Sequence, residues 1–256
     1  MDKQSFNGLT GSYVQAHYDQ FFADGKKDYT FDRWQRTPES KYHFAQSLRV
    51  FLRAIAPIRA KNALEIGGGD GLWTRIFAPH TERMTCLDIS EGMLNQAQKK
   101  LADLPIPIGF LHKDFLENTF LDGQFDAVLA FRCFEYFPDK QRALEELYRV
   151  LAPGGTLVLM TKSPQYDWRG YFSAKQLHAG IMEVRELRTA FQKQGFRVID
   201  IYPGITGKGL STRVGRWVGE GLQWFLIATR SWFPRILSRY VCESFLFVVQ
   251  KPSSNV

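Results

Sequence analysis

A glycine-rich turn, Glu65-Ile66-Gly67-Gly68-Gly69-Asp70-Gly71, follows a short apolar run and precedes an amphipathic segment. Gly67, Gly69 and Gly71 alternate in phase with Glu65. Glycine lets the backbone approach a ligand where a Cβ would clash, and a helix that follows would aim its free N–H groups at that ligand. The turn therefore predicts a site for a nucleotide-type ligand, with a tight turn that binds nothing as the alternative.

The register of these glycines separates two classes of ligand. A dinucleotide-binding turn follows the pattern Gly-x-Gly-x-x-Gly. Counted from Gly67, the third glycine position is occupied by Leu72, and counted from Gly69 it is occupied by Thr74. Both registers fail, so the sequence argues against an NAD-dependent enzyme.

Asp88 is a second candidate binding residue, because it ends the next apolar run, 23 positions after Glu65. An acidic residue at the end of the second strand, about 20 residues after a glycine turn, can accept hydrogen bonds from a ribose diol. A helix-capping or solvated aspartate is the alternative. The pairing with the glycine turn favours the binding role.

The elements that must position these residues alternate between strands and helices. Apolar runs of four to eight residues predict strands, and runs with helical periodicity predict the helices between them. The expected strands are 63–66, 84–88, 108–111, 125–131, 156–161, 196–202 and 244–250. The expected helices are 72–77, 91–104, 140–151 and 184–194. This alternation predicts an α/β fold with a seven-stranded, mostly parallel sheet and helices on both faces.

Two appendages accompany this sheet in the predicted organisation. Residues 1–57 form an N-terminal helical lid region, in which 42–56 is a clear amphipathic helix. Residues 58–256 form the catalytic domain, which includes a helical insertion at 204–243 before the last strand. No linker rich in Pro, Gly or Ser divides the chain.

Five segments in order resemble the motifs of the class I methyltransferases that use S-adenosylmethionine (SAM). The resemblance covers about residues 60–161, and only the series, not any single motif, is specific. The segments are Ala63 to Gly71, Cys86 to Ser90 with Met93-Leu94, His112 to Phe115, Gln124 to Leu129, and Arg149 to Leu157. The resemblance implies SAM as the cofactor.

The resemblance also implies a role for each matching position. Glu65 and the backbone of Gly67, Gly68, Gly69 and Gly71 would hold the amino acid end of SAM. Asp88 would bind the ribose hydroxyls. The remaining positions would hold the adenine and the sulfonium: Ile89 and Met93 packing on the adenine, Asp114 accepting from its amino group, Phe115 beside it, and Phe131 near the sulfonium.

Methyl transfer is an in-line displacement that needs a nucleophile about 3 Å from the methyl group in a dry pocket. A base is required only when the acceptor is protonated at the working pH. Glu135, His17 and Tyr18 are the candidate catalytic residues, with helix capping or packing as the alternatives. Arg33 and Arg36 could reach an anionic group, although solvated surface is the simpler interpretation. No histidine or cysteine spacing predicts a metal site.

The insertion at 204–243 carries six basic and two acidic residues, interleaved with Trp, Phe, Leu and Ile. Its longest uncharged run, 221–229, is too short to span a bilayer, which needs about 20 apolar residues. We consider a lid over an acceptor pocket, membrane-surface contact through 207–241, a homodimer interface, and plain packing on the sheet. Large aliphatic residues among the arginines argue against nucleic acid.

Composition sets the remaining expectations. The chain has 256 residues, 45% of them apolar, a net charge of +7, and three cysteines without CxxC spacing. No signal-peptide pattern is present, so we expect a cytoplasmic protein. Peripheral contact with the inner face of a membrane is a second option that we consider. The predicted function is SAM-dependent O-methylation of a hydrophobic small-molecule or lipid-linked acceptor. The alternatives are a SAM-binding regulatory or partner subunit without turnover, and an N- or C-methyltransferase.

Overall fold

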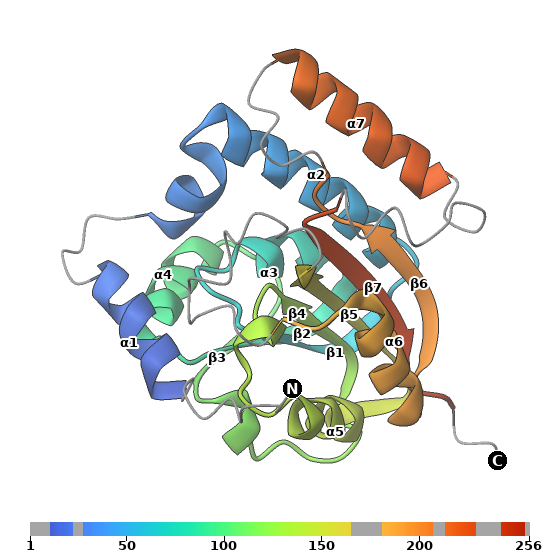
Figure 1. Cartoon of the computed structure of the whole chain (residues 1–256). Coiled ribbons are helices and arrows are strands. Elements are labelled where there is room, and N and C mark those ends of the chain that lie inside the picture. The colour runs from blue at the N-terminus through green and yellow to red at the C-terminus, as the bar shows by residue number, and fades with distance from the viewer. Residues whose placement is uncertain (1–10, 23–27, 165–180, 207–212, 229–241, 254–256) are drawn as a thin grey trace.

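The computed structural model describes residues 11–22, 28–164, 181–206, 213–228 and 242–253. A seven-stranded sheet with strand order β3-β2-β1-β4-β5-β7-β6 forms its centre (Figure 1). The paired neighbours are parallel except at β7, which runs antiparallel to both β5 and β6. The strands are β1 Ala60–Ile66, β2 Thr81–Asp88, β3 Ile108–His112, β4 Phe125–Phe131, β5 Leu151–Lys162, β6 Arg197–Pro203 and β7 Ser244–Gln250. The predicted α/β class with a mostly parallel sheet is confirmed.

Helices connect these strands and precede the first of them (Figure 1). The α-helices are α1 Gly11–Phe22, α2 Pro38–Ile55, α3 Leu72–Phe77, α4 Glu91–Leu101, α5 Lys140–Val150, α6 Val184–Lys193 and α7 Arg213–Ala228. Short turns of other helix types are η1 Phe31–Gln35, η2 Ala78–His80, η3 Phe115–Glu117 and η4 Phe134–Tyr136. The insertion therefore contains one described helix, α7, between β6 and β7. Residues 207–212 and 229–241 of the insertion lie outside the described residues.

Alternating side chains of the strands send two apolar layers to opposite faces of the sheet. In β1, Leu64 and Ile66 face the layer that contains α5 and α6, whereas Ala63 faces the layer that contains α2 and α3. Helix α4 packs on Cys86 of β2 in a smaller cluster. Both faces are therefore covered, which leaves the carboxyl ends of the parallel strands as the place for a ligand.

Several element boundaries differ from the sequence prediction by a few residues. Strand β5 begins at Leu151 rather than at 156, because Leu151 pairs with Phe125 before the register shifts to Ala127 against Thr156. Helix α5 ends at Val150, and the Pro-Gly-Gly segment lies within β5, with Gly154 at φ +80°. Helix α4 ends at Leu101, three residues before the predicted end.

Helix α2 packs directly on the sheet. Thr37 caps its first turn in a capping box with Ser40. Val50, Phe51 and Ile55 are fully buried in the same apolar cluster as β1 and β4 residues. In contrast, α1 lies beside α4 at the carboxyl edge of the sheet (Figure 1). The domain boundary predicted after residue 57 stays a prediction.

Candidate active site

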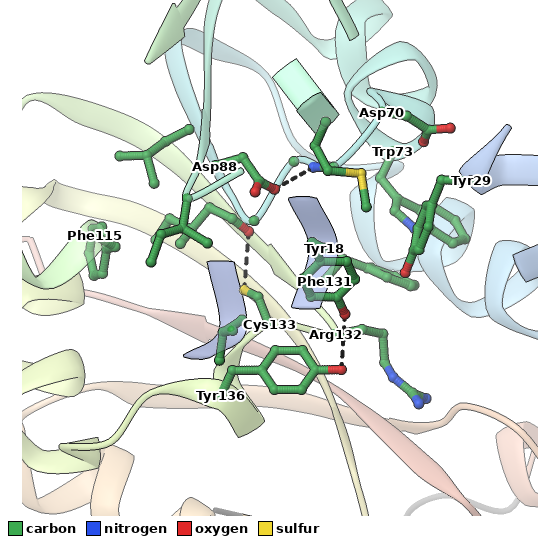
Figure 2. Close-up of a pocket in the computed structure, with 18 of the residues that line it drawn as sticks. Tyr18, Tyr29, Asp70, Trp73, Asp88, Phe115, Phe131, Arg132, Cys133 and Tyr136 are labelled. Atoms are coloured by element: carbon green, nitrogen blue, oxygen red, sulfur yellow. Dashed lines mark hydrogen bonds between the residues drawn. The ribbon is translucent and has the colours of Figure 1, made fainter. Parts of the chain in front are cut away.

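A pocket opens at the carboxyl ends of β1, β2 and β4, beneath α1 and the segment that leads into η1 (Figure 2). The β1–α3 turn, the end of β2 and the end of β4 each contribute to its wall. Most of its lining residues are Ile66, Gly67, Gly68, Gly69, Asp70, Leu87, Asp88, Ile89, Met93, Asp114, Phe115, Phe131, Arg132, Cys133 and Tyr136, with Tyr18, Tyr29, Arg33 and Trp34 from the N-terminal segment.

The glycine turn leaves one part of its backbone open to this pocket. Gly67 and Gly69 have φ angles of +66° and +57°, which L side chains rarely adopt. A Cβ at Gly67 would lie 2.6 Å from the Cβ of Cys133, so this residue packs against the start of the β4–α5 loop. A Cβ at Gly69 would meet only the Met93 sulfur, at 3.9 Å. Gly69 thus faces space that a ligand can fill.

Asp88 is held beside this opening by backbone donors. The Gly69 N–H donates to its Oδ2 at 2.8 Å (Figure 2). The Ser90 N–H donates to its Oδ1 at 2.9 Å. Burial raises the pKa of the Asp88 carboxyl, whereas the backbone N–H donors oppose that rise. Each carboxylate oxygen has more than one acceptor site, so Asp88 can still accept hydrogen bonds from a ligand in the pocket.

An apolar surface continues from Asp88 along one side of the pocket. It is formed by Leu87, Ile89, Met93 and Phe115. Asp114 also lines this side, although its Oδ1 accepts from the Leu116 N–H at 2.9 Å and so caps η3. This surface suits a flat aromatic ring with a polar edge at Asp114.

Glu65 and Gly71, two predicted contacts with the ligand, are absent from the pocket lining. Glu65 is completely buried, its Oε2 accepts a hydrogen bond from Thr74 Oγ1, and its carboxyl carbon lies under Gly68. Burial raises the pKa of Glu65 to about 8. Gly71 is the N-cap of α3, at φ +86°, and packs on Leu101. The alternation of side chains in β1 turns the Glu65 side chain away from the pocket. Both residues therefore support the turn on the side opposite the pocket.

Aromatic side chains from distant segments form the opposite wall. The rings of Trp73 and Phe131 are stacked with centroids 3.8 Å apart, and both residues line the pocket. Trp73 is also part of the apolar core, so it both packs the sheet and lines the pocket. Asp126 lies outside this wall and accepts from the backbone N–H groups of residues 61 and 62.

A tyrosine cluster, made of Tyr18, Tyr29 and Tyr136, closes the pocket next to Phe131. The Tyr18 hydroxyl donates to the Tyr136 hydroxyl at 3.3 Å, and the rings of Tyr18 and Tyr29 meet edge to face at 6.1 Å (Figure 2). Burial raises the pKa of all three phenols. At neutral pH these hydroxyls therefore stay protonated and act as hydrogen-bond donors rather than as bases.

Arg132 lines the pocket beside the tyrosine cluster, with its side chain running past the Tyr136 hydroxyl (Figure 2). It has a φ of +62°, the only non-glycine residue with positive φ among the described residues. Its Nε lies 3.4 Å from Glu135 Oε1, and its Nη2 lies 3.6 Å from Glu243 Oε1. Its buried Nη1 has no hydrogen-bond partner within the part of the chain that the structure describes. Burial, and then the charge of Arg132, lower the pKa of neighbouring Lys162 to about 7.

The three candidate catalytic residues fall in different places. Tyr18 lines the pocket, whereas His17 is exposed on α1 and does not. Glu135 is 1% exposed, accepts from Thr161 Oγ1 at 3.1 Å, and lies behind Arg132 rather than in the lining. In this arrangement Glu135 positions Arg132 and is not placed to remove a proton from a molecule in the pocket.

Sequence reasoning missed several residues of this wall. Arg33 lines the pocket with its guanidinium carbon 4.3 Å from the centre of the Trp34 ring, whereas Arg36 is exposed and pairs with Asp32. Tyr29, Arg132, Cys133 and Tyr136 were not singled out. The only available signal was the position of residues 132–136 directly after β4, which drew attention to Glu135 alone.

Residues 64–159 match the model of a methyltransferase domain. This segment is a methyltransferase domain of the class I, SAM-dependent type, for which SAM is the cosubstrate. The predicted methyltransferase type and cofactor are thereby confirmed.

Among curated relatives, the biotin biosynthesis bifunctional protein of Bordetella avium is 31% identical over 160 residues, 61% of this chain and 34% of that protein. The demethylmenaquinone methyltransferase of Thermus thermophilus is 39% identical over 107 residues, which cover 41% of this chain and 48% of that protein. The chain thus spans about a third to a half of the length of these relatives.

Two solved structures show how widely the fold is shared. The N-methyltransferase NodS from Bradyrhizobium japonicum, in complex with S-adenosylhomocysteine, has a TM-score of 0.61 at 17% identity and covers 92% of this chain and 98% of its own. The [4+2]-cyclase SpnF has a TM-score of 0.66 at 17% identity and covers 96% of this chain and 98% of its own. These likenesses concern the fold, and one fold can host different reactions.

Proposed function

We propose that this protein transfers the methyl group of SAM to an oxygen atom of a largely apolar small molecule. One observation carries the proposal: a single pocket joins the open glycine turn and Asp88 to an aromatic wall that ends at Arg132. The first half suits the cofactor of the family, and the second half offers hydrogen-bond donors and a cation to an acceptor.

The residues of the first half fit SAM. The buried Asp88 carboxylate would accept from the ribose hydroxyls, and the backbone around Gly69 leaves the space that the amino acid end needs. Ile89, Met93 and Phe115 would pack on the adenine, with Asp114 at its amino group. SAM supplies an activated methyl group, so the protein has to supply position and electrostatics. Phe131, at the end of β4, would lie near the sulfonium.

The second half favours an acceptor that is negatively charged or becomes so. Among the described residues, the tyrosine cluster, Arg132 and Arg33 are the polar groups that line this wall, whereas the carboxylates of Glu135 and Glu243 contact Arg132 from outside the lining. The protonated phenols can donate to an acceptor oxygen, and Arg132 would stabilise a phenolate, enolate or carboxylate. The same cation would repel a protonated amine. This electrostatic preference supports oxygen over nitrogen as the methylated atom.

The acceptor therefore needs no strong base from the protein. Tyr18 would act by orienting the Tyr136 hydroxyl, to which it donates, and Glu135 by holding Arg132 in place. A phenolate or enolate also carries negative charge on ring or chain carbon, so C-methylation remains an alternative on the same wall. The alternative that is not an enzyme is a SAM-binding partner subunit without turnover. Such a subunit would bind SAM but would produce no methylated product.

Calorimetric titration with S-adenosylhomocysteine tests the first half. We expect saturable binding to the wild type and its loss in Gly69→Val, in which the added side chain fills the open cradle. If the wild type does not bind, the proposed function is wrong. Incubation with radiolabelled SAM, a cell extract and a panel that includes demethylmenaquinone then tests turnover. A labelled methyl ester or phenol methyl ether of an apolar molecule supports the proposal, whereas binding without any labelled product supports the partner subunit.

A further inference from the structure

Helix α7 exposes large hydrophobic side chains on its outer side. Five large hydrophobic residues, here called the outer stripe, follow one face of the helix and are between 48% exposed, at Phe225, and 76% exposed, at Trp217. The outer stripe consists of Val214, Trp217, Val218, Trp224 and Phe225. Their spacing of three, four, seven and eleven residues places them on the same side of an α-helix. Figure 1 shows α7 as the outermost helix, lying beside α2.

The opposite side of α7 is the buried side, and it combines the core residues Leu226 and Ile227, each 3% exposed, with small and polar residues. A Cβ at Gly219 would collide with the Tyr42 hydroxyl, so the α7 backbone lies against α2 at this point. Gln223 is completely buried and donates from Nε2 to the backbone oxygens of Gln46 and Pro203, each at 3.2 Å. Thr206 Oγ1 donates to the Gly219 carbonyl at 2.8 Å.

These contacts fix the rotation of the helix about its own axis. Rolling α7 to bury the outer stripe would leave Gln223 and its backbone partners without their hydrogen bonds, which destabilises buried polar groups. Rolling would also bring larger side chains to the position where only Gly219 fits. The outward direction of the outer stripe is therefore specified by the fold and calls for a partner of its own.

We propose that the outer stripe of α7 docks on the surface of an anionic lipid bilayer. The stripe offers roughly 600 Å² of apolar area, judged from the usual size of such side chains, whereas a stable protein interface needs about 800 Å² from each partner. This area is too small for a firm dimer by itself but is ample for a helix lying in the plane of a membrane interface. Trp and Phe are the residues that favour that interface. No described helix is long and apolar enough to cross a bilayer.

Positive charge accompanies the outer stripe. The guanidinium of Arg49, on α2, lies 5.0 Å from the centre of the Trp224 ring. Exposed Arg53 follows one turn later on α2. Helix α7 itself contains two arginines and a single acidic residue, Glu220, in a chain whose net charge is +7. Basic residues next to an interfacial helix are attracted to an anionic leaflet, so the charge favours anionic over neutral lipid.

Co-sedimentation of the full chain with vesicles tests this proposal. The vesicles contain phosphatidylcholine alone or phosphatidylcholine with about a third phosphatidylserine. The test variant is Trp217→Ser with Trp224→Ser. The matched control is Leu121→Ser with Ile199→Ser, which removes two other exposed hydrophobic residues, 74% and 49% exposed, that are not part of α7. S-adenosylhomocysteine titration and thermal melting of each variant report whether the fold is retained, independently of lipid.

We expect the wild type and the control to pellet with anionic vesicles and the α7 variant to partition at least tenfold less. The wild type should pellet several-fold less with neutral vesicles. Equal pelleting of the wild type and the α7 variant would overturn the proposal, as would no pelleting at all. Light scattering provides a further test. A dimer that forms in the wild type and is absent in the α7 variant would also overturn the proposal, because the outer stripe would then join two copies of the chain. Failure of lipid binding with intact S-adenosylhomocysteine binding leaves the proposed function standing.

Discussion

Two glycines of the β1–α3 turn allow the fold and the ligand site to be tested separately, because an added methyl group meets protein at one and open space at the other. Alanine in a left-handed backbone conformation lowers the free energy of unfolding by about 1–2 kcal/mol. Up to about 1 kcal/mol of this loss is offset, because alanine restricts the unfolded chain more than glycine does. Gly67 and Gly69 share this cost, since their φ angles are +66° and +57°.

The surroundings of the two positions make the difference. At Gly67 the new Cβ would lie 2.6 Å from the Cβ of Cys133, an atom that no side-chain rotation can move. Forcing such an overlap adds about 1–3 kcal/mol. At Gly69 the only neighbour is the flexible Met93 sulfur at 3.9 Å. We expect Gly69→Ala to lower the free energy of unfolding by about 1 kcal/mol and Gly67→Ala by about 3 kcal/mol, or roughly 3 °C and 10 °C in Tm.

Thermal melting with and without S-adenosylhomocysteine provides the assay. A ligand at a hundred times its Kd stabilises the wild type by about 2.7 kcal/mol. Gly69→Ala should lose most of this ligand-induced shift, because its methyl group projects into the cradle. Gly67→Ala should melt earlier yet keep more of the shift. The reasoning is refuted if Gly69→Ala retains the full wild-type shift, or if it melts as early as Gly67→Ala.

Three further predictions concern single charges. The folded pKa of Glu65 is about 8, above the ordinary value of 4.5, so the folded state binds more protons and stability falls as pH rises from 4.5 to 8. Urea unfolding at pH 5 and pH 8 should show this fall, on the order of a few kcal/mol, in the wild type and not in Glu65→Gln; equal falls would exclude a protonated Glu65. Asp88→Asn should weaken S-adenosylhomocysteine binding about 10- to 100-fold in calorimetry, since hydrogen bonds to a charged group contribute about 1.5–3 kcal/mol; unchanged affinity would remove Asp88 from the ribose site. Arg132→Lys keeps the charge beside Glu135 but loses the forked donors, so kcat/KM for the identified acceptor should fall at least tenfold with S-adenosylhomocysteine affinity unchanged; a matching loss of that affinity would instead place Arg132 at the cofactor.

The cofactor half of the pocket was predictable because its residues are close in sequence to the elements that place them. The glycine turn, Asp88 and Phe131 each end a parallel strand, and parallel strands bring their carboxyl ends to one edge of a sheet. Glu65 shows the limit of matching a motif without the geometry of the strand. It shares the face of Ala63 in β1, so strict alternation already directs its side chain under the turn.

The acceptor half was largely out of reach of sequence reasoning because long-range contacts assemble it. Arg132 depends on Glu243, which precedes β7 more than a hundred residues later. Its positive φ is a conformation that residue type does not reveal. Arg33 and Arg36 are alike in sequence context, and only the path of η1 across the pocket places the first inside and the second in solvent.

Asp70, in the glycine turn, links the two halves of the pocket through its hydrogen bonds. Its carboxylate accepts from the N–H of Thr30 at 2.9 Å and from the Thr30 hydroxyl at 2.8 Å, and the Lys100 ammonium donates to it at 2.7 Å. Thr30 directly follows Tyr29 of the tyrosine cluster and precedes η1, which carries Arg33. The backbone of the turn stays open at Gly69, while the side chain of the next residue holds the N-terminal wall over the same space. The acceptor wall is therefore positioned by the turn that would hold the cofactor, which places the two reactants of a methyl transfer in one hydrogen-bonded frame.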